Sequence, residues 1–167
     1  MFLLIALLTA CATEKQGPAI GADAAGDVVV YAIRHMEKET TPGDQDPALT
    51  DVGTDRAQTL ATFLTDIELA AAYSTPYKRT IGTIEPTADV HGLEIDTTWD
   101  GTTQLAAHIL ATHDGETVIS SGHSNTVPAL IAGLGADAPI IEESSYGEMW
   151  VVTVTDGVAT AVLTPFE

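Results

Sequence analysis

The sequence predicts a three-layer α/β/α domain, with helices on both faces of a mostly parallel central sheet that has an antiparallel edge. Two patterns support this fold class. Between residues 28 and 134, short β-branched or apolar runs alternate with longer segments of helical periodicity, the order expected of parallel strands joined by helices. Nearer the C-terminal end, Asp156 and Gly157 separate two further strand-like runs, which is typical of a tight hairpin turn.

The individual elements follow from the same patterns. Residues 28–33 form an apolar, β-branched run that is too short for a helix and suits a strand buried on both faces. Thr50 or Asp51 is predicted to cap the first helix, whereas Pro86 is predicted to kink or end the second. Further strands are expected at residues 70–74, 93–97, 117–121, 148–154 and 158–163, and helices at 51–64, 76–90, 104–111 and 126–134.

The chain is strongly acidic. Its 167 residues include 24 acidic and only 6 basic residues, which gives a formal net charge of -18. Such a charge excludes nucleic acid and anionic lipid surfaces as partners, because both would be repelled. Four of the six basic residues lie in two pairs, Arg34 with Lys38 and Lys78 with Arg79, so the scarce positive charge is concentrated at two places.

The N-terminal residues predict export and a lipid anchor. Residues 1–10 are an apolar run too short to span a bilayer, and residues 8–11 resemble the processing site of bacterial lipoproteins, in which Cys11 becomes the lipidated first residue. Residues 11–26 are then a flexible tether, and the folded domain covers residues 27–167. We expect a monomer on the periplasmic or cell-surface face of a bacterial membrane. The alternative is a signal peptide that is cut elsewhere.

Four side chains that suit phosphate chemistry follow the predicted parallel strands. Arg34 and His35 end the first strand, Arg79 follows the second, and His123, with Ser124 and Asn125 behind it, follows the strand at 117–121. Ligands of an open parallel sheet bind beyond the carboxyl ends of its strands, so these side chains are expected to meet. Guanidinium groups bind phosphoryl oxygens in pairs, and a neutral imidazole attacks phosphorus directly. This chemistry requires no metal ion or other cofactor.

The motifs around these side chains resemble those of the histidine phosphatase superfamily, which has the phosphoglycerate-mutase-like fold. The Arg-His-Gly motif corresponds to residues 34–36, with Met36 in place of glycine; the Leu-Thr-x-x-Gly, Ser-Pro-x-x-Arg and second-histidine motifs correspond to residues 49–53, 74–80 and 122–125. The resemblance implies that His35 becomes a phosphohistidine and that Arg34 and Arg79 clamp the phosphoryl oxygens. It also implies that His123 donates to the same group and that Ser124 and Asn125 contact the substrate.

The acid that protonates the leaving group and the substrate itself stay open. Glu37 and Asp100 are the two candidates for the acid. The segment from 76 to 100 is short, so we expect an open, uncapped pocket that accepts a small phosphomonoester, a phosphoramidate or a phosphorylated protein side chain. His91, His108 and His113 are interpreted as structural, and no metal site is expected.

Three other functions share some of these sequence features. A serine hydrolase built on Ser124 is disfavoured, because no histidine follows His123 to complete the triad order of that class. A mutase is disfavoured by the short chain. The serious alternative is a lipoprotein that binds a phosphate-bearing ligand without turning it over, because Met36 replaces the glycine and no acid is assigned.

Overall fold

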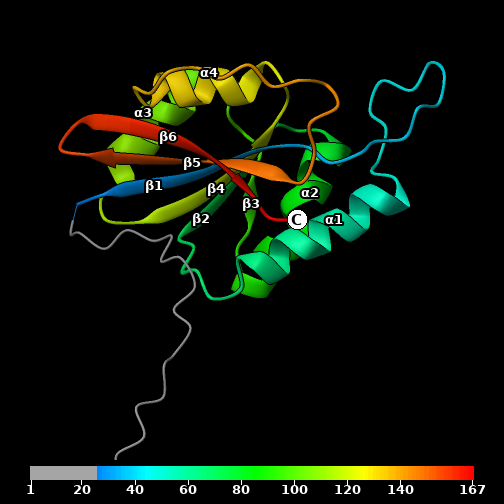
Figure 1. The fold of residues 1–167 in the computed structure, drawn as a ribbon, viewed down its shortest axis with the longest axis horizontal. Coiled ribbons are helices and arrows are strands. Elements are labelled where there is room, and N and C mark those ends of the chain that lie inside the picture. The colour runs from blue at the N-terminus through cyan, green and yellow to red at the C-terminus, as the bar shows by residue number, and fades with distance from the viewer. Residues whose placement is uncertain (1–25) are drawn as a thin grey trace, which may run out of the picture.

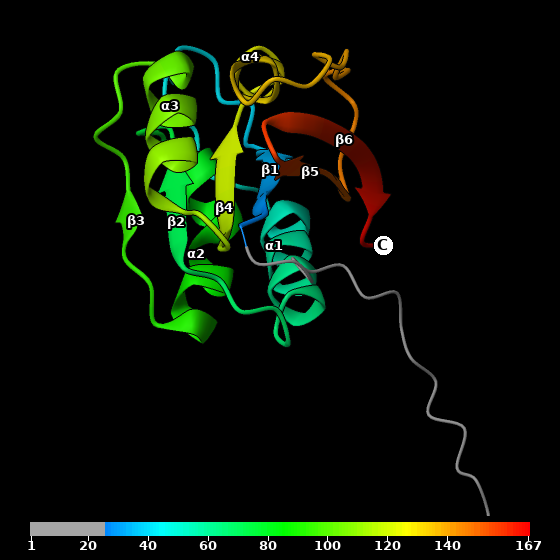
Figure 2. The same ribbon diagram turned by 90° about the vertical axis from the view of Figure 1, so that its left-hand side faces the viewer.

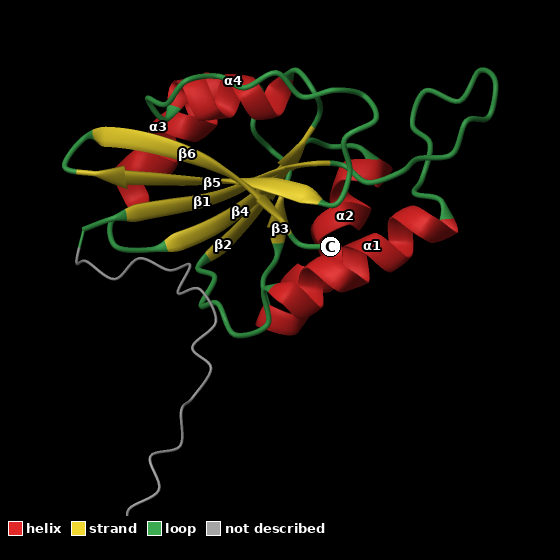
Figure 3. Ribbon diagram, in the orientation of Figure 1, coloured by secondary structure: helices red, strands yellow, loops and turns green. Residues whose placement is uncertain are grey.

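The structure, a computed structural model, describes residues 26–167. The predicted export signal, Cys11 and nearly all of the predicted tether lie outside the described residues. Residues 26–167 form six strands and four helices (Figures 1 and 3). In chain order these are β1 (Val28–Arg34), α1 (Asp51–Phe63), β2 (Ala71–Ser74), α2 (Lys78–His91), β3 (Ile95–Asp96), α3 (Thr102–Thr112), β4 (Thr117–Gly122), α4 (Thr126–Gly133), β5 (Glu148–Thr155) and β6 (Val158–Pro165).

The strands form one sheet in the order β3-β2-β4-β1-β5-β6. The first four strands of this order are parallel to one another, whereas β5 is antiparallel to β1 and β6 is antiparallel to β5. Asp156 and Gly157 join β5 to β6, and their positive φ values of 50° and 79° are those that a two-residue hairpin turn demands. The predicted fold class, including its antiparallel edge, is confirmed.

Helices cover both faces of the sheet, with α1 and α2 on one face and α3 and α4 on the other (Figure 2). Strand β1 is buried on both sides, so its alternate residues enter two different cores. Val28, Val30 and Ala32 pack with side chains of α3 and α4. The residues between them face α1 and α2, where Leu60 and Ile84 are fully buried. Within residues 26–167, no helix combines the length and apolar character needed to cross a membrane.

The ends of α1 and α2 confirm the cap predicted for α1 and contradict one of the two effects predicted for Pro86, an end to α2. Thr50 caps α1, because its hydroxyl oxygen accepts a hydrogen bond of 3.0 Å from the backbone N–H of Gly53. Pro86 does not end α2, which continues to His91. A proline removes only one helical hydrogen bond, and the neighbouring residues Ile84 and Ala88 are held in the core, so tertiary packing outweighs the local preference.

Candidate active site

Two neighbouring strands bring the two histidines together. Strands β1 and β4 are parallel and in register, with Arg34 opposite Gly122. The backbone N–H of His35 donates to the carbonyl of Gly122 at 2.9 Å, which extends the ladder one residue past the strand end. The imidazole rings of His35 and His123 consequently meet edge to face, with centroids 5.3 Å apart. As expected, the side chains of His35 and His123 lie next to each other at the edge of the sheet.

His35 is held in the form that a nucleophile needs. Its side chain is buried, and its Nδ1 lies 2.7 Å from the carbonyl oxygen of Met36. A carbonyl only accepts hydrogen bonds, so the proton is on Nδ1 and the lone pair is on Nε2. Burial, together with the positive charge of Arg34 and the proximity of His123 and Arg79, lowers the pKa of His35 to about 4. The imidazole is therefore neutral at physiological pH.

Arg79 and His123 form a second unit. Arg79, in the first turn of α2, donates from Nη2 to Nε2 of His123 at 2.8 Å and lies over the ring of Tyr77. Burial and the charge of Arg79 lower the pKa of His123 to about 4. Within the described part of the chain, Nε and Nη1 of Arg79 have no hydrogen-bond partner, and the nearest carboxylate oxygen, on Asp46, is 3.8 Å from Nη1. These N–H groups suit an anion.

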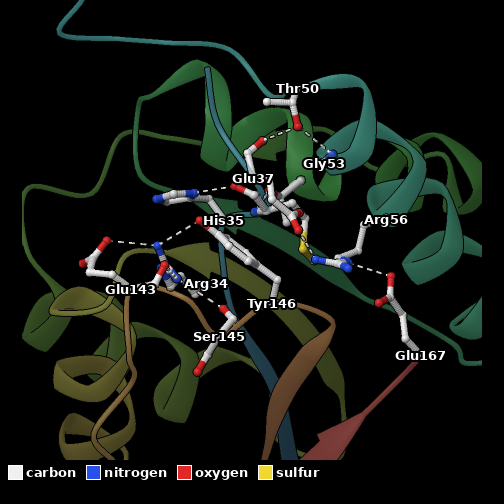
Figure 4. Close-up of polar contacts among 12 residues, drawn as sticks. Arg34, His35, Glu37, Thr50, Gly53, Arg56, Glu143, Ser145, Tyr146 and Glu167 are labelled. Atoms are coloured by element: carbon white, nitrogen blue, oxygen red, sulfur yellow. Dashed lines mark hydrogen bonds and ion pairs between the residues drawn. The ribbon is translucent and has the colours of Figure 1, made fainter. Parts of the chain in front are cut away.

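Arg34 is held by a segment that the sequence did not single out. Its Nη1 donates to the carbonyl oxygens of Glu142, Glu143 and Ser145 at 3.0, 2.7 and 3.2 Å, and the ring of Tyr146 lies under its guanidinium (Figure 4). Its Nη2 donates to the carboxylate of Glu143 at 3.0 Å. The expectation of an uncapped pocket is therefore wrong at Arg34, which is only 5% exposed. Segment 142–146 joins α4 to β5, more than 100 residues away, so no local pattern indicates the contact.

Glu143 also bridges to one of the predicted substrate contacts. The hydroxyl of Ser124 donates to its second carboxylate oxygen at 2.6 Å. This hydrogen bond and the charge of Arg34 lower the pKa of Glu143, which is therefore an ionised carboxylate and not a proton donor.

The two candidate acids lie in different surroundings. The carboxylate of Glu37 is ion-paired with Arg56, which also binds Glu167 at 2.6 Å (Figure 4). Hydrogen bonding to Glu167, with the charge of Glu37 beside it, raises the pKa of Arg56, so Glu37 faces a permanent cation. Asp100 is exposed and lines a cavity beside the site. Asp100 therefore has access to the cavity, whereas the carboxylate of Glu37 is engaged by Arg56.

The Leu-Thr-x-x-Gly motif supports the backbone that follows His35. The N–H of Thr50 donates to the carbonyl of Glu37 at 2.9 Å. A Cβ atom on Gly53 would collide with that same carbonyl oxygen, so only glycine allows α1 to begin this close to the segment. The motif therefore fixes the position of residues 36 and 37 and contributes no group to the phosphoryl site.

Met36, which stands in place of the motif's glycine, is accommodated without strain. Its φ is not positive, since Asp156 is the one non-glycine residue with positive φ in residues 26–167, and its side chain is buried in the core on the α1 and α2 face. Its N–H donates to the hydroxyl of Thr83 at 2.9 Å. The backbone N–H at this position is thus engaged by the protein.

A cavity of about 630 Å³ extends from Arg79 and His123 toward α3 and α4. Its walls include aromatic and aliphatic side chains, and Asn125, predicted to contact the substrate, also lines it. Trp99 is fixed there by a hydrogen bond of 2.9 Å from its indole N–H to Asp96 and by stacking on His108. Ser121 is among the residues that line the cavity, but its hydroxyl is buried in the protein and has no hydrogen-bond partner among residues 26–167. The volume lies within the range of small-molecule sites.

The remaining histidines have structural contacts. His113 lies between the hydroxyl of Tyr73 at 2.7 Å and the carboxylate of Glu116 at 2.6 Å. His91 lies 3.2 Å from the carbonyl oxygen of Leu64. No group of three or more His, Cys, Asp or Glu side chains in the described range is arranged to hold a metal ion.

Comparison with known proteins agrees with this geometry. The sequence model of the Histidine phosphatase superfamily (branch 1) matches residues 30–102. No curated protein matches the sequence of the chain.

Solved structures of phosphatases share the fold. The chain is similar to the protein histidine phosphatase SixA complexed with tungstate, with 20% identity over 84% of this chain and 97% of the other, and a TM-score of 0.67. It is similar to YhfR of Bacillus stearothermophilus, with 21% identity, coverage of 81% and 96%, and a TM-score of 0.63. It is also similar to a phosphoserine phosphatase mutant of Entamoeba histolytica in complex with phosphoserine, with 15% identity over 84% of this chain and 98% of the other, and a TM-score of 0.64. In its sequence over residues 30–102, in its four motifs and in the paired histidines on this fold, the chain is similar to the histidine phosphatase superfamily.

Proposed function

We propose that the protein is a metal-independent phosphatase that transfers the phosphoryl group of its substrate to Nε2 of His35. The observation that carries this proposal is the hydrogen bond between Nδ1 of His35 and the carbonyl of Met36, which leaves Nε2 as the basic atom beside Arg79 and His123. The names of the similar structures, which include a protein histidine phosphatase and a phosphoserine phosphatase, support the same reaction class.

The reaction has two steps. Nε2 of His35 forms a bond to phosphorus while the bond from phosphorus to the leaving group breaks, and the free N–H groups of Arg79 stabilise the charge on the phosphoryl oxygens. Water then attacks the phosphohistidine, which releases phosphate and restores the neutral imidazole. The proton of His35 Nδ1 is held by Met36 in both steps, so the ring keeps its orientation.

We propose Asp100 as the acid that protonates the leaving group, because it lines the cavity that Arg79 and His123 also line, whereas Glu37 is paired with Arg56. Asp100→Asn should lower kcat strongly for an alkyl phosphate such as glycerol 3-phosphate and less for phenyl phosphate, because a phenol leaves with less help. Glu37→Gln should lower kcat less than Asp100→Asn for both substrates. The reverse ranking would assign the acid to Glu37.

The cavity supports a substrate whose leaving group is aromatic or apolar. Trp99 and Tyr77 supply aromatic surface, and Leu105 and Leu130 supply aliphatic surface. We expect kcat/KM for 1-naphthyl phosphate to exceed that for glycerol 3-phosphate at least tenfold. The variant Leu130→Trp should abolish this preference, whereas Ala129→Trp, on the exposed side of the same helix, should keep it.

The central test is hydrolysis of p-nitrophenyl phosphate without added metal. Wild-type protein should turn over and should trap a phosphorylated histidine when quenched in base. His35→Ala should do neither, and His91→Ala, which removes an imidazole in the last turn of α2, should do both. Equal activity of wild type and His35→Ala would reject the mechanism.

The second candidate is a protein that binds a phosphate-bearing ligand without turnover, and the pairing of Glu37 with Arg56 favours it, since it removes one of the two candidate acids. Tight binding of inorganic phosphate by calorimetry, together with no hydrolysis of any ester, would support this candidate.

We also propose that Cys11 is lipidated and anchors an exported protein to a bacterial membrane. The support is the sequence of residues 1–11 alone. Mass spectrometry of the protein from its native membrane should find a diacylglyceryl group on an N-terminal Cys11, and an unmodified cysteine would contradict the proposal.

A further inference from the structure

The backbones of Met36 and Arg79 both hydrogen-bond to one buried hydroxyl, that of Thr83. Thr83, on α2, is fully buried. Its Oγ1 accepts a hydrogen bond of 2.9 Å from the backbone N–H of Met36 and donates one of 2.8 Å to the backbone carbonyl of Arg79. A hydroxyl can do both at once, because it carries one proton and two lone pairs. One oxygen atom therefore connects the peptides of two functional segments that are 43 residues apart in the sequence, at Met36 and Arg79.

The peptide of Met36 is consequently held from two directions. Its carbonyl oxygen lies against Nδ1 of His35, and its N–H is held by Thr83. The carbonyl sets the orientation of the imidazole ring and the side of the ring that carries the proton. A change in the position of this peptide would rotate Nε2 of His35 relative to the guanidinium of Arg79.

We propose that Thr83 is a positioning residue of the phosphoryl-transfer reaction, fixing the nucleophile His35 relative to Arg79 through the peptide of Met36. The inference rests on the proposed function for its consequence in turnover. Misplacing a reacting group by about 1 Å can lower a rate by about a hundredfold. Thr83 touches neither the transferred group nor the substrate cavity, so it acts through the residues that it holds.

Helix α2 itself offers a matched control. Thr87 lies one turn after Thr83 and is equally buried, but its hydroxyl has no hydrogen-bond partner in the described residues. Replacing either threonine by valine keeps the β-branched shape and removes one hydroxyl. The two variants therefore differ in whether the lost hydroxyl joins Met36 to Arg79.

The experiment compares four proteins with p-nitrophenyl phosphate. Thr83→Val should lower kcat at least tenfold, Thr83→Ser should retain kcat within about threefold of wild type because it keeps the hydroxyl, and Thr87→Val should equal wild type. Equal kcat in Thr83→Val and Thr87→Val would overturn the inference, as would a loss in Thr83→Ser as large as that in Thr83→Val. An inactive wild type would instead refute the proposed function.

A second measurement needs neither turnover nor the valine variant. Hydrogen exchange of the Met36 amide in the wild-type protein should be as slow as that of the amides inside β1, and it should stay slow in Thr83→Ser. Fast exchange of this amide in the wild type would show that the link to Thr83 does not persist in solution, and it would overturn the inference even if Thr83→Val failed to fold.

Discussion

The variant Glu143→Gln should tighten the binding of inorganic phosphate. In the structure the carboxylate of Glu143 holds Nη2 of Arg34 and the hydroxyl of Ser124, both of which are predicted to face the phosphoryl group. A phosphoryl group that enters the site must displace the Glu143 carboxylate before it can bind Nη2 of Arg34. Glutamine keeps the size and an acceptor oxygen but loses the charge, so the group that phosphate must displace is held less strongly.

The size of the effect follows from the ion pair. Two unit charges about 4 Å apart attract by about 1 to 4 kcal/mol between the dielectric of water and that of a protein surface. Arg34 is buried, but the side chain of Glu143 is 78% exposed, which puts the pair at the lower end, at about 1 kcal/mol. One kcal/mol corresponds to about a fivefold change in an equilibrium constant.

The assay is competitive inhibition by inorganic phosphate, or calorimetry if turnover is slow. Glu142→Gln is the matched control, because it removes the same charge one residue earlier, where the side chain is exposed and the backbone carbonyl alone contacts Arg34. We expect the inhibition constant to fall about fivefold in Glu143→Gln and by less than twofold in Glu142→Gln. Equal changes in the two variants, or weaker phosphate binding in Glu143→Gln, would refute the reasoning.

Three further predictions concern stability and charge. In the folded protein the pKa of His35 is about 4, whereas in the unfolded chain it is about 6.5, so between pH 6.5 and 4 the unfolded chain binds a proton at this residue and the native state does not. The free energy of unfolding should therefore fall by up to about 3 kcal/mol over this pH range, and by less in His35→Ala. Urea titrations at each pH measure it. Gly53→Ala should lower the free energy of unfolding by about 1–3 kcal/mol, because its new Cβ atom would collide with the carbonyl of Glu37. Gly82→Ala should be neutral or stabilising by up to about 1 kcal/mol, because its Cβ atom would meet only the end of the Leu49 side chain. Equal urea midpoints for the two variants would contradict the steric argument. Added salt should raise kcat/KM for p-nitrophenyl phosphate or leave it unchanged, because it screens the repulsion between an anionic substrate and a chain of net charge -18; a steep fall would show that local positive charge dominates the encounter.

The sequence predicts the parts of this structure that depend on neighbouring residues. The apolar run at β1 and the turn at Asp156 and Gly157 are local signals, and both elements form where they are expected. The meeting of His35, Arg79 and His123 was also predictable, because each follows a parallel strand and such strands end at one edge of the sheet. The cap at Thr50 is likewise local.

The parts that sequence reasoning missed depend on contacts between distant segments. Glu143 is one acidic residue among 24, and nothing near it in the sequence indicates that it binds Arg34. The pairing of Glu37 with Arg56 joins a loop to the outside of α1, so it could not be distinguished from an unpaired carboxylate beside the nucleophile. The persistence of α2 through Pro86 reflects packing against the sheet, which local propensity does not contain.

The register of β1 against β4 has a consequence for how such a site survives divergence. The two histidines follow paired strand ends, and the 5.3 Å between their rings is close to the spacing of neighbouring strands in any sheet. That spacing is set by main-chain hydrogen bonds, which every residue except proline can make. Strand pairing can therefore hold the two imidazoles at a similar separation although many side chains elsewhere differ, as fits a fold shared with proteins only 15 to 21% identical.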